Sequence, residues 1–393
     1  MRKSKTLYLL SATFPYGSRE TFLEAEIKYL SSVFQRIVII PLAGNIKNRR
    51  EIPSNCIALN PIIENRFKQY LHLFSLKGFR LFVGDFFKKR VWCNKQRLKS
   101  WSIAYILFNN YICSKQIKIM LRELASDDVV YSYWGKGGCY LAPILKGKAK
   151  IVSRFHGEWD LWEESSGNYA PVRNIVANSL SLAVFISLKG EIYFKQRYNC
   201  PTLVSRLGTI NSGNISEKSS DGVLRIVSCS SVYQLKRVPL IYQAIQLIED
   251  IPIEWTHIGG GVDFEKLKIQ VKTTRDNVSI RLLGEVPNKE VLNYYKNEPV
   301  DLFINVSANE GVPVSIMEAI SYNIPVIATD VGSSSEIVTP ETGLLISANP
   351  TLIEIKKAIL KVASLSIIPR LFWEKNYNAD INYRLFAKTL FEL

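Results

Sequence analysis

Histidine, methionine and cysteine are scarce in this chain of 393 residues, and their spacing argues against one class of site. The sequence holds three histidines, three methionines and six cysteines. No two cysteines form a Cys-x-x-Cys pair, and none lies near a histidine at ligand spacing, so we expect no zinc site. Cysteines scattered singly are typical of free thiols in a reducing compartment.

Long apolar runs are also lacking. No run is long enough to span a bilayer, and the apolar run at residues 7–10 is shorter than the core of a signal peptide. No small-residue cleavage site follows that run. We therefore expect a first β-strand there, in a cytoplasmic protein that is soluble or bound to the inner face of the cytoplasmic membrane.

Acidic side chains are few in one segment of a chain whose formal net charge is +15. Residues 45–120 contain fifteen Lys or Arg and only three acids, and aromatic residues interleave with the charges over 64–120. Helices with cationic and aromatic sides settle at anionic membrane surfaces. A solvated helical face on a basic protein is the alternative. Nucleic-acid binding is not expected, because no recognised binding motif accompanies the charge.

Short apolar runs rich in β-branched residues alternate with stretches of helical spacing throughout the chain. This alternation predicts an α/β fold with parallel sheets covered on both faces. The polar segment 208–222 is rich in Gly, Ser and Asn and predicts a linker. We expect two Rossmann-like, doubly wound domains that face a common cleft, with the following bounds: an acceptor-binding domain at 1–207, the linker at 208–222, a nucleotide-sugar-binding domain at 223–370 and a helix packing back on the body at 371–393.

The most informative segment follows the apolar run 301–306 and reads Glu310-Gly-Val-Pro-Val-Ser-Ile-Met-Glu318. Gly311 and Pro313 favour a tight loop, and proline is tolerated where a helix begins, so we predict a helix from about Pro313. The backbone N–H groups at such a helix start attract phosphate. Taken alone, two glutamates eight positions apart are common, and they are better explained as one acid in a loop and another on a solvated helix face.

The surroundings of this segment resemble retaining glycosyltransferases of family four, which have the GT-B fold and include bacterial capsular and surface polysaccharide transferases. Two glutamates separated by seven residues, with glycine after the first, are the signature of that family. The runs 255–261, 324–332, 335–338 and 342–345 follow its order, and the loop 282–288, with Val286, resembles the one that contacts the nucleotide base. The resemblance covers essentially all of residues 222–350.

The resemblance implies roles for the segment. Glu318 would accept hydrogen bonds from the ribose hydroxyls of the nucleotide, and Glu310 would contact hydroxyls of the transferred sugar. The backbone at Gly311, Val312 and Pro313 would approach the sugar and the diphosphate.

Lys236 matches the family's lysine that stabilises the leaving diphosphate, because a fixed cation offsets the charge that develops there. The family usually has an arginine five or six residues earlier, where this chain has Ser230 and Ser231. Arg237 and Arg206 are the two candidates for the missing cation.

The amino-terminal half matches more loosely. Residues 14–22 resemble the family's glycine loop, in which Gly17 and Ser18 would offer N–H groups to the donor diphosphate; an ordinary strand–helix turn explains them equally well. Arg19 is a candidate acceptor contact.

His156 follows the apolar run 149–155 and resembles the family's active-site histidine, which contacts the sugar. Asp160 would assist it or contact the acceptor. A His–Asp general-base pair, as in inverting enzymes, is the competing interpretation.

The resemblance implies a hexosyltransferase that uses a UDP- or GDP-sugar, retains the anomeric configuration and needs neither cofactor nor metal. The expected acceptor is a glycan, in particular one linked to a polyprenyl diphosphate. Two alternatives remain: a GT-B transferase with a soluble acceptor, and a non-catalytic protein that binds nucleotide sugars.

Overall fold

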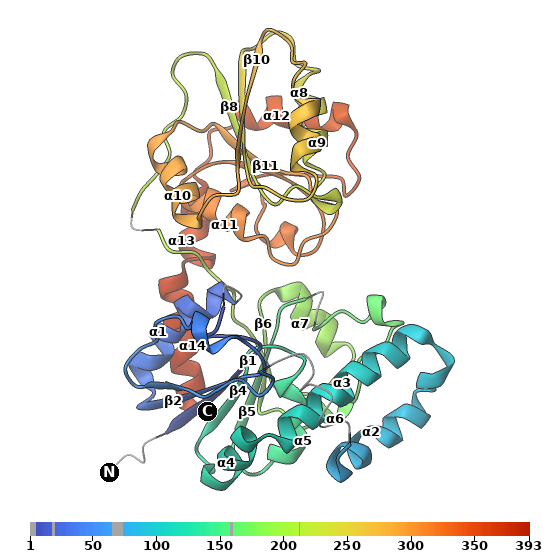
Figure 1. Cartoon of the computed structure of the whole chain (residues 1–393). Helices are drawn as coiled ribbons and strands as arrows, with labels where there is room; N and C mark the ends of the chain where they lie inside the picture. Colours follow the sequence, from blue (N-terminus) through green and yellow to red (C-terminus); the bar gives the residue numbers. More distant parts are fainter. Residues whose placement is uncertain (1–4, 18–19, 65–73, 158–159, 212) are drawn as a thin grey trace. The chain divides into compact units, whose positions relative to one another are not determined.

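The structure is a computed structural model, and it describes residues 5–17, 20–64, 74–157, 160–211 and 213–393. The chain forms two compact units (Figure 1). The first contains the described residues of Met1–Leu207 together with Ile381–Leu393, and the second contains those of Gly208–Asp380. Each is built on a parallel sheet, which confirms the expected α/β class.

The first unit has a seven-stranded parallel sheet within the described residues, in the order β3-β2-β1-β4-β5-β6-β7. Strands β1, β2, β4, β5 and β6 are buried along nearly their whole length, as expected of a sheet covered on both faces, whereas the edge strands β3 and β7 are partly exposed. The strand order reverses between β1 and β4, so loops that follow these strands meet at one edge. The strands are β1 (Thr6–Ser11), β2 (Arg36–Pro41), β3 (Cys56–Ala58), β4 (Val129–Ser132), β5 (Lys150–Phe155), β6 (Leu182–Phe185) and β7 (Thr202–Val204).

Helices cover both faces of this sheet. One face packs against α1 (Thr21–Val33) and α14 (Ala379–Glu392), which contribute residues such as Leu23 and Phe386 to a common core. The other face packs against the remaining helices of the unit. These are α2 (Leu76–Lys88), α3 (Lys95–Cys113), α4 (Lys115–Glu123), α5 (Ala142–Leu145), α6 (Arg173–Ala177) and α7 (Leu188–Lys195), with short 3₁₀ turns η1 (Ile46–Asn48), η3 (Val91–Cys93), η4 (Gly138–Leu141) and η5 (Glu164–Ser166).

The second unit has a six-stranded parallel sheet within the described residues, in the order β10-β9-β8-β11-β12-β13. The strand order reverses between β8 and β11, and sheets of this type bind ligands beyond the carboxyl ends of their strands at such a point. The strands are β8 (Leu224–Cys229), β9 (Ile253–Ile258), β10 (Val278–Gly284), β11 (Leu302–Asn305), β12 (Val326–Thr329) and β13 (Gly343–Ile346).

The helices of the second unit also divide between the two faces of their sheet. Residues of α8, α9 and α12 form the core on one face, and those of α10, α11 and α13 form the core on the other. The elements are α8 (Val238–Ile245), α9 (Phe264–Gln270), α10 (Asn288–Asn297), α11 (Val314–Ser321), α12 (Leu352–Ala363) and α13 (Pro369–Asn376), with 3₁₀ turns η6 (Gln234–Lys236) and η7 (Ser334–Glu336).

The carboxy-terminal segment, expected as one helix, forms the two helices α13 and α14. Thr209 interrupts the helical hydrogen bonds, because its N–H donates to the Tyr377 carbonyl at 3.0 Å and its carbonyl accepts from the Ala379 N–H at 3.1 Å. The polar segment 208–222 is part of the second unit, where the Ser216 N–H donates to the carbonyl of Tyr322. Within the described residues, no helix combines the length and apolar character needed to cross a membrane.

Candidate functional site

Two loops meet at the edge of the second sheet where its strand order reverses. One follows β8 and contains Lys236, and the other follows β11 and contains Glu310. These strands are parallel neighbours, so their carboxyl ends lie side by side. The N–H of Ala308 donates to the Leu235 carbonyl at 2.7 Å and joins the two loops.

The ammonium of Lys236 pairs directly with the carboxylate of Glu310. Lys236 Nζ lies 2.6 Å from Glu310 Oε1, and both side chains are mostly buried, with 18% and 11% exposed. Asn305, at the end of β11, donates its Nδ2 to the same oxygen at 3.2 Å and accepts the Ser307 N–H through Oδ1. Asn305 therefore holds the carboxylate in place beside the cation. The sequence analysis did not select Asn305, although a polar residue at the end of a buried strand is a usable signal.

Gly332 fixes the backbone of the Glu310 loop. Its φ of 57° lies in the left-handed region, and a Cβ there would lie 1.7 Å from the carbonyl oxygen of Glu310. The N–H of Ser333 also donates to the Gly311 carbonyl at 3.0 Å. Only glycine allows this approach, so the segment after β12 sets the position of the Glu310 loop.

The helix predicted from about Pro313 is α11, which begins at Val314 with Pro313 at its N-cap position. Pro313 is buried, whereas Gly311 and Val312 are partly exposed. Pro313 supplies no side-chain cap to the first turn of α11. The backbone N–H groups of this turn carry the partial positive charge of the helix start and are suited to an anion.

Glu318 lies further along α11 and is nearly buried, with 8% exposed. Its Oε1 accepts a hydrogen bond from Asn288 Nδ2 at 2.8 Å. Burial raises the pKa of Glu318 to about 7, despite the opposing effect of the Asn288 hydrogen bond. Asn288 begins α10, two residues after Val286, which packs against the core beneath α11. The structure thus brings Glu318 to the loop predicted to contact a base.

Arg237 braces the site loops through its guanidinium. Its Nε donates to the Val306 carbonyl at 2.7 Å, and its Nη2 donates to the carbonyls of Ser307 and Ala348, both at 2.8 Å. Burial lowers the pKa of this group. With its donors directed at carbonyls on two loops, Arg237 positions the backbone after β11. A role for Arg237 as the second phosphate cation stays a prediction.

In the first unit, Asp160 organises the loop that follows β5. Its Oδ1 accepts the N–H groups of His156 and Gly157, at 2.8 and 3.0 Å, and its Oδ2 accepts the Gly135 N–H at 2.9 Å. His156 Nδ1 lies 3.4 Å from Asp160 Oδ2. Burial acts to raise the pKa of Asp160, but the hydrogen bonds from His156 and the backbone outweigh it and hold that pKa below its usual value.

The ring of His156 is packed between two aromatic rings. The centroids of the Tyr133 and Trp134 rings lie 4.8 and 4.3 Å from its own. Its side chain is 12% exposed, and Nε2 is buried with no hydrogen-bond partner among the described residues. Asp160 thus orients the His156 ring, and a role for His156 toward a ligand stays a prediction.

The first unit contains four further residues that were predicted to contact a donor or an acceptor: Gly17, Ser18, Arg19 and Arg206. The N–H of Gly17 donates to the Asn48 carbonyl at 2.9 Å, and Arg206 lies partly buried two residues after β7. Ser18 and Arg19 lie outside the described residues. The roles of all these residues toward a donor or an acceptor stay predictions.

The carboxylate of Glu20 accepts hydrogen bonds from the backbone N–H groups of the loop after β1. The sequence analysis did not predict this role. The carboxylate accepts the N–H groups of Ala12, Thr13 and Phe14 at 2.7–2.9 Å, and the indole N–H of Trp134 at 2.7 Å. Trp134 follows β4, so this carboxylate joins the two loops at the point where the order of the first sheet reverses. An acid three residues after a glycine turn is the only sequence signal for it.

No cluster of three or more histidine, cysteine or acidic side chains suited to a metal ion occurs within the described ranges.

The second unit matches a known family. Residues 215–378 match the family model described as "Glycosyl transferases group 1". A curated relative is the amylovoran biosynthesis glycosyltransferase AmsK of Erwinia amylovora, which is 24% identical over 271 residues, or 63% of this chain and 64% of AmsK. The matches cover between 24% and 64% of the curated relatives' own lengths. For one of these relatives, this chain spans about half of its length, 52%.

Two solved structures resemble the whole chain. The apo form of the lipopolysaccharide outer core galactosyltransferase WaaB has a TM-score of 0.66 at 15% identity, covering 99% of each chain. HepE of Anabaena in complex with UDP has a TM-score of 0.64 at 14% identity, covering 99% of this chain and 100% of HepE. At such identities the likeness establishes the fold. The chain has the GT-B fold, and its residues 215–378 match the family model of glycosyl transferases group 1.

Proposed function

We propose that this protein is a retaining glycosyltransferase that moves a sugar from a nucleotide-sugar donor to a hydroxyl of a glycan acceptor. The observation that carries the proposal is the Lys236–Glu310 pair, held at 2.6 Å beside the first turn of α11. A cation, a carboxylate and a helix start at one sheet edge suit the diphosphate and the hydroxyls of a nucleotide sugar.

The donor is proposed to be a UDP-sugar, with a GDP-sugar as the other candidate. HepE, which has the same fold, was crystallised with UDP and with UDP-glucose. In the proposed arrangement Glu318 accepts hydrogen bonds from the ribose hydroxyls, and the loop with Val286 lies against the base. Asn288 would then hold the Glu318 carboxylate toward the ribose, since it already donates to Oε1.

The proposed chemistry retains the configuration of the anomeric carbon. The bond from that carbon to the diphosphate oxygen breaks while the acceptor oxygen attacks from the same face. The proton of the acceptor hydroxyl passes to the departing diphosphate. Lys236 and the N–H groups at the start of α11 stabilise the charge that develops on the leaving group, so that no metal ion is needed for it. Glu310 positions the sugar hydroxyls.

The acceptor is proposed to be a bacterial surface glycan carried on a lipid, met at the inner face of the cytoplasmic membrane. AmsK is named for the biosynthesis of amylovoran. Exposed aromatic side chains on α2 and η3, among them Phe79, Phe87 and Trp92, accompany the lysines and arginines of that region. Such a surface suits anionic lipids.

A donor screen tests the proposal. Thermal unfolding is followed with UDP-, GDP- and ADP-sugars, and slow release of free sugar is measured for each. A ligand that binds the folded state raises the unfolding midpoint in proportion to its occupancy. We expect one nucleotide class to stabilise the protein and its sugar to be released. Stabilisation without sugar release, from any donor and with any acceptor glycan, would instead identify a non-catalytic binding protein.

A further inference from the structure

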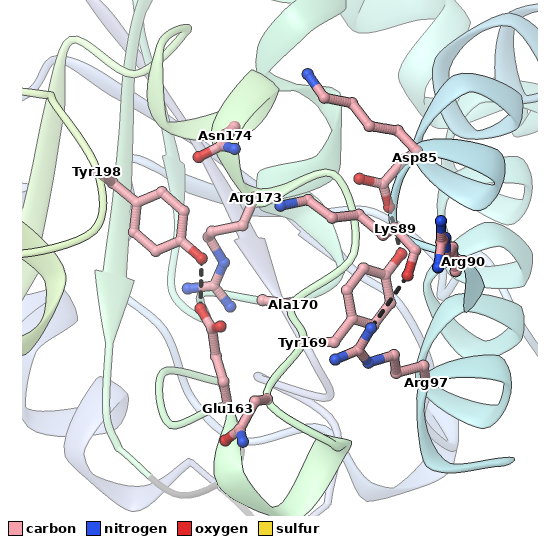
Figure 2. A pocket seen from close by; sticks show the side chains of 12 residues that line it. Asp85, Lys89, Arg90, Arg97, Glu163, Tyr169, Ala170, Arg173, Asn174 and Tyr198 are labelled. Atoms are coloured by element: carbon pink, nitrogen blue, oxygen red, sulfur yellow. Dashed lines mark hydrogen bonds between the residues drawn. The ribbon is translucent and has the colours of Figure 1, made fainter. Parts of the chain in front are cut away.

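A cavity of about 370 Å³ in the first unit lies outside the groups assigned above. One wall comes from the end of α2 and from α3, and the other from residues 163–174 and Tyr198 (Figure 2). Among the described residues, its charged lining consists of five cations against two acids. The cations are Lys88, Lys89, Arg90, Arg97 and Arg173, and the acids are Asp85 and Glu163.

Both acids already have hydrogen-bond donors. Asp85 Oδ2 accepts the hydroxyl of Tyr169 and the N–H of Val172, and Glu163 Oε1 accepts the hydroxyl of Tyr198. Lys88, Lys89 and Arg90 form no ion pair with a carboxylate in the described part of the chain. The cavity therefore has an excess of positive charge that the protein itself does not neutralise.

Arg173 is the buried member of this group, with only 4% exposed. Its Nη2 donates to the Asp160 carbonyl at 2.6 Å, while its buried Nη1 has no partner among the described residues. A guanidinium nitrogen left without a partner in a buried position is costly unless a ligand supplies an acceptor. Its location in the cavity lining indicates that the missing acceptor belongs to a bound anion.

The cavity is linked to His156 and adjoins an exposed apolar pair. Asp160, whose carbonyl accepts from Arg173, holds the N–H of His156 through its carboxylate. Phe87 and Trp92 are close in sequence to the cavity cations. Their ring centroids lie 5.6 Å apart, and the two residues are 61% and 50% exposed. A ligand with an anionic head and an apolar chain matches both features.

We infer that this cavity is a binding site for a phosphate-bearing group carried on an apolar chain, with Arg173 and the lysines 88 and 89 on the phosphate oxygens. Its assignment as the acceptor's lipid phosphate rests on the proposed transferase function. The anion would lie against the backbone of Asp160, the residue that orients His156. The Phe87–Trp92 pair would cover the first part of the chain.

Two matched double variants test the site in the full-length protein. Lys88→Gln/Lys89→Gln removes two exposed cavity lysines, and Lys95→Gln/Lys99→Gln removes two exposed lysines of α3 that do not line it. The probe is geranyl diphosphate, titrated calorimetrically. We expect the cavity variant to raise its Kd about tenfold and the control variant by about twofold or less, since each direct charge–phosphate contact contributes more than a distant surface charge.

The comparison does not depend on the donor site, because both variants keep Lys236 and any diphosphate bound there affects them equally. Titration with UDP provides the separate readout. Unchanged UDP affinity in the cavity variant, together with its loss of geranyl diphosphate binding, supports two distinct sites. If no nucleotide binds but the cavity variant still loses the probe, the cavity site stands and the proposed function fails. If the two double variants bind geranyl diphosphate with equal Kd values and also bind phosphatidylglycerol vesicles equally, the inference is overturned.

Inorganic pyrophosphate and vesicles of phosphatidylglycerol distinguish the sources of phosphate. We expect geranyl diphosphate to bind more tightly than pyrophosphate, because the chain adds apolar contact. Should the cavity variant lose only its binding to phosphatidylglycerol vesicles, with geranyl diphosphate bound equally by all proteins, the ligand is a membrane headgroup and the acceptor assignment is wrong.

Discussion

Lys236 Nζ and Glu310 Oε1 lie 2.6 Å apart although 74 residues separate them in the chain. The pairing follows from topology: the two residues leave neighbouring parallel strands at the point where the strand order reverses. Asn305 and Gly332 then fix the carboxylate side of the pair, by a hydrogen bond and by close backbone packing. The proposed donor site depends on that geometry.

Gly332→Ala is expected to weaken nucleotide binding because it displaces the Glu310 loop. The new Cβ would lie 1.7 Å from the Glu310 carbonyl oxygen, so the loop must move. Gly222→Ala is the matched control: it also has a positive φ, of 79°, but nothing lies within 4 Å of its Cβ. Both variants pay about 1 kcal/mol for a left-handed alanine. Calorimetric titration with UDP should separate them, and equal UDP affinities would contradict the role given to Gly332.

The stability of the protein should depend on pH through Glu318. Burial raises the pKa of this carboxyl to about 7, above its value in the unfolded chain. Its contribution to stability is therefore fully present below the unfolded pKa and is lost as pH rises toward 7. Relative to Glu318→Gln, the wild type should lose up to about 1.4 kcal/mol per pH unit in that window. Denaturant unfolding of both proteins between pH 5 and 8 measures this, and parallel pH profiles would refute it.

The buried pair of Glu26 and Arg154 should be far more important to folding than a surface pair. Both side chains are fully buried, and Arg154 also lies 4.2 Å from the ring centroid of Phe386 in α14. Glu26→Gln leaves a buried guanidinium without its carboxylate and should cost about 3–5 kcal/mol.

Glu123→Gln is the matched control for Glu26→Gln, because it breaks the exposed pair with Arg36 and should cost about 1 kcal/mol or less. Urea unfolding compares the two variants. Similar free energies of unfolding for the two variants would show that the buried pair contributes no more to stability than the surface pair.

The fold class and the centre of the candidate site could be predicted from sequence because their signals are local. Runs of buried β-branched residues indicate parallel strands, and a Gly-x-Pro turn after such a run indicates where α11 begins. The predicted start near Pro313 is confirmed, with Val314 as the first helical residue.

Other features depend on partners that only the fold brings close. The guanidinium of Arg237 is directed by carbonyls at 306, 307 and 348, which no spacing rule connects to it. The break between α13 and α14 depends on the distant Thr209. The Glu20 carboxylate on the loop after β1 has only a weak signal in the sequence, and the cavity at Arg173 has none, because each joins segments far apart in the chain.

The most direct test of the donor site is the affinity of Lys236→Met for the nucleoside diphosphate that stabilises the wild type most. Lys266→Met is the matched control, because Lys266 also pairs with a carboxylate, that of Asp263 at 2.7 Å, but is 77% exposed. Removing a cation that contacts the diphosphate should raise the Kd about tenfold or more, whereas the control should bind as the wild type does. Equal affinity of the two variants for the nucleotide would contradict the placement of the donor site at Lys236 and Glu310.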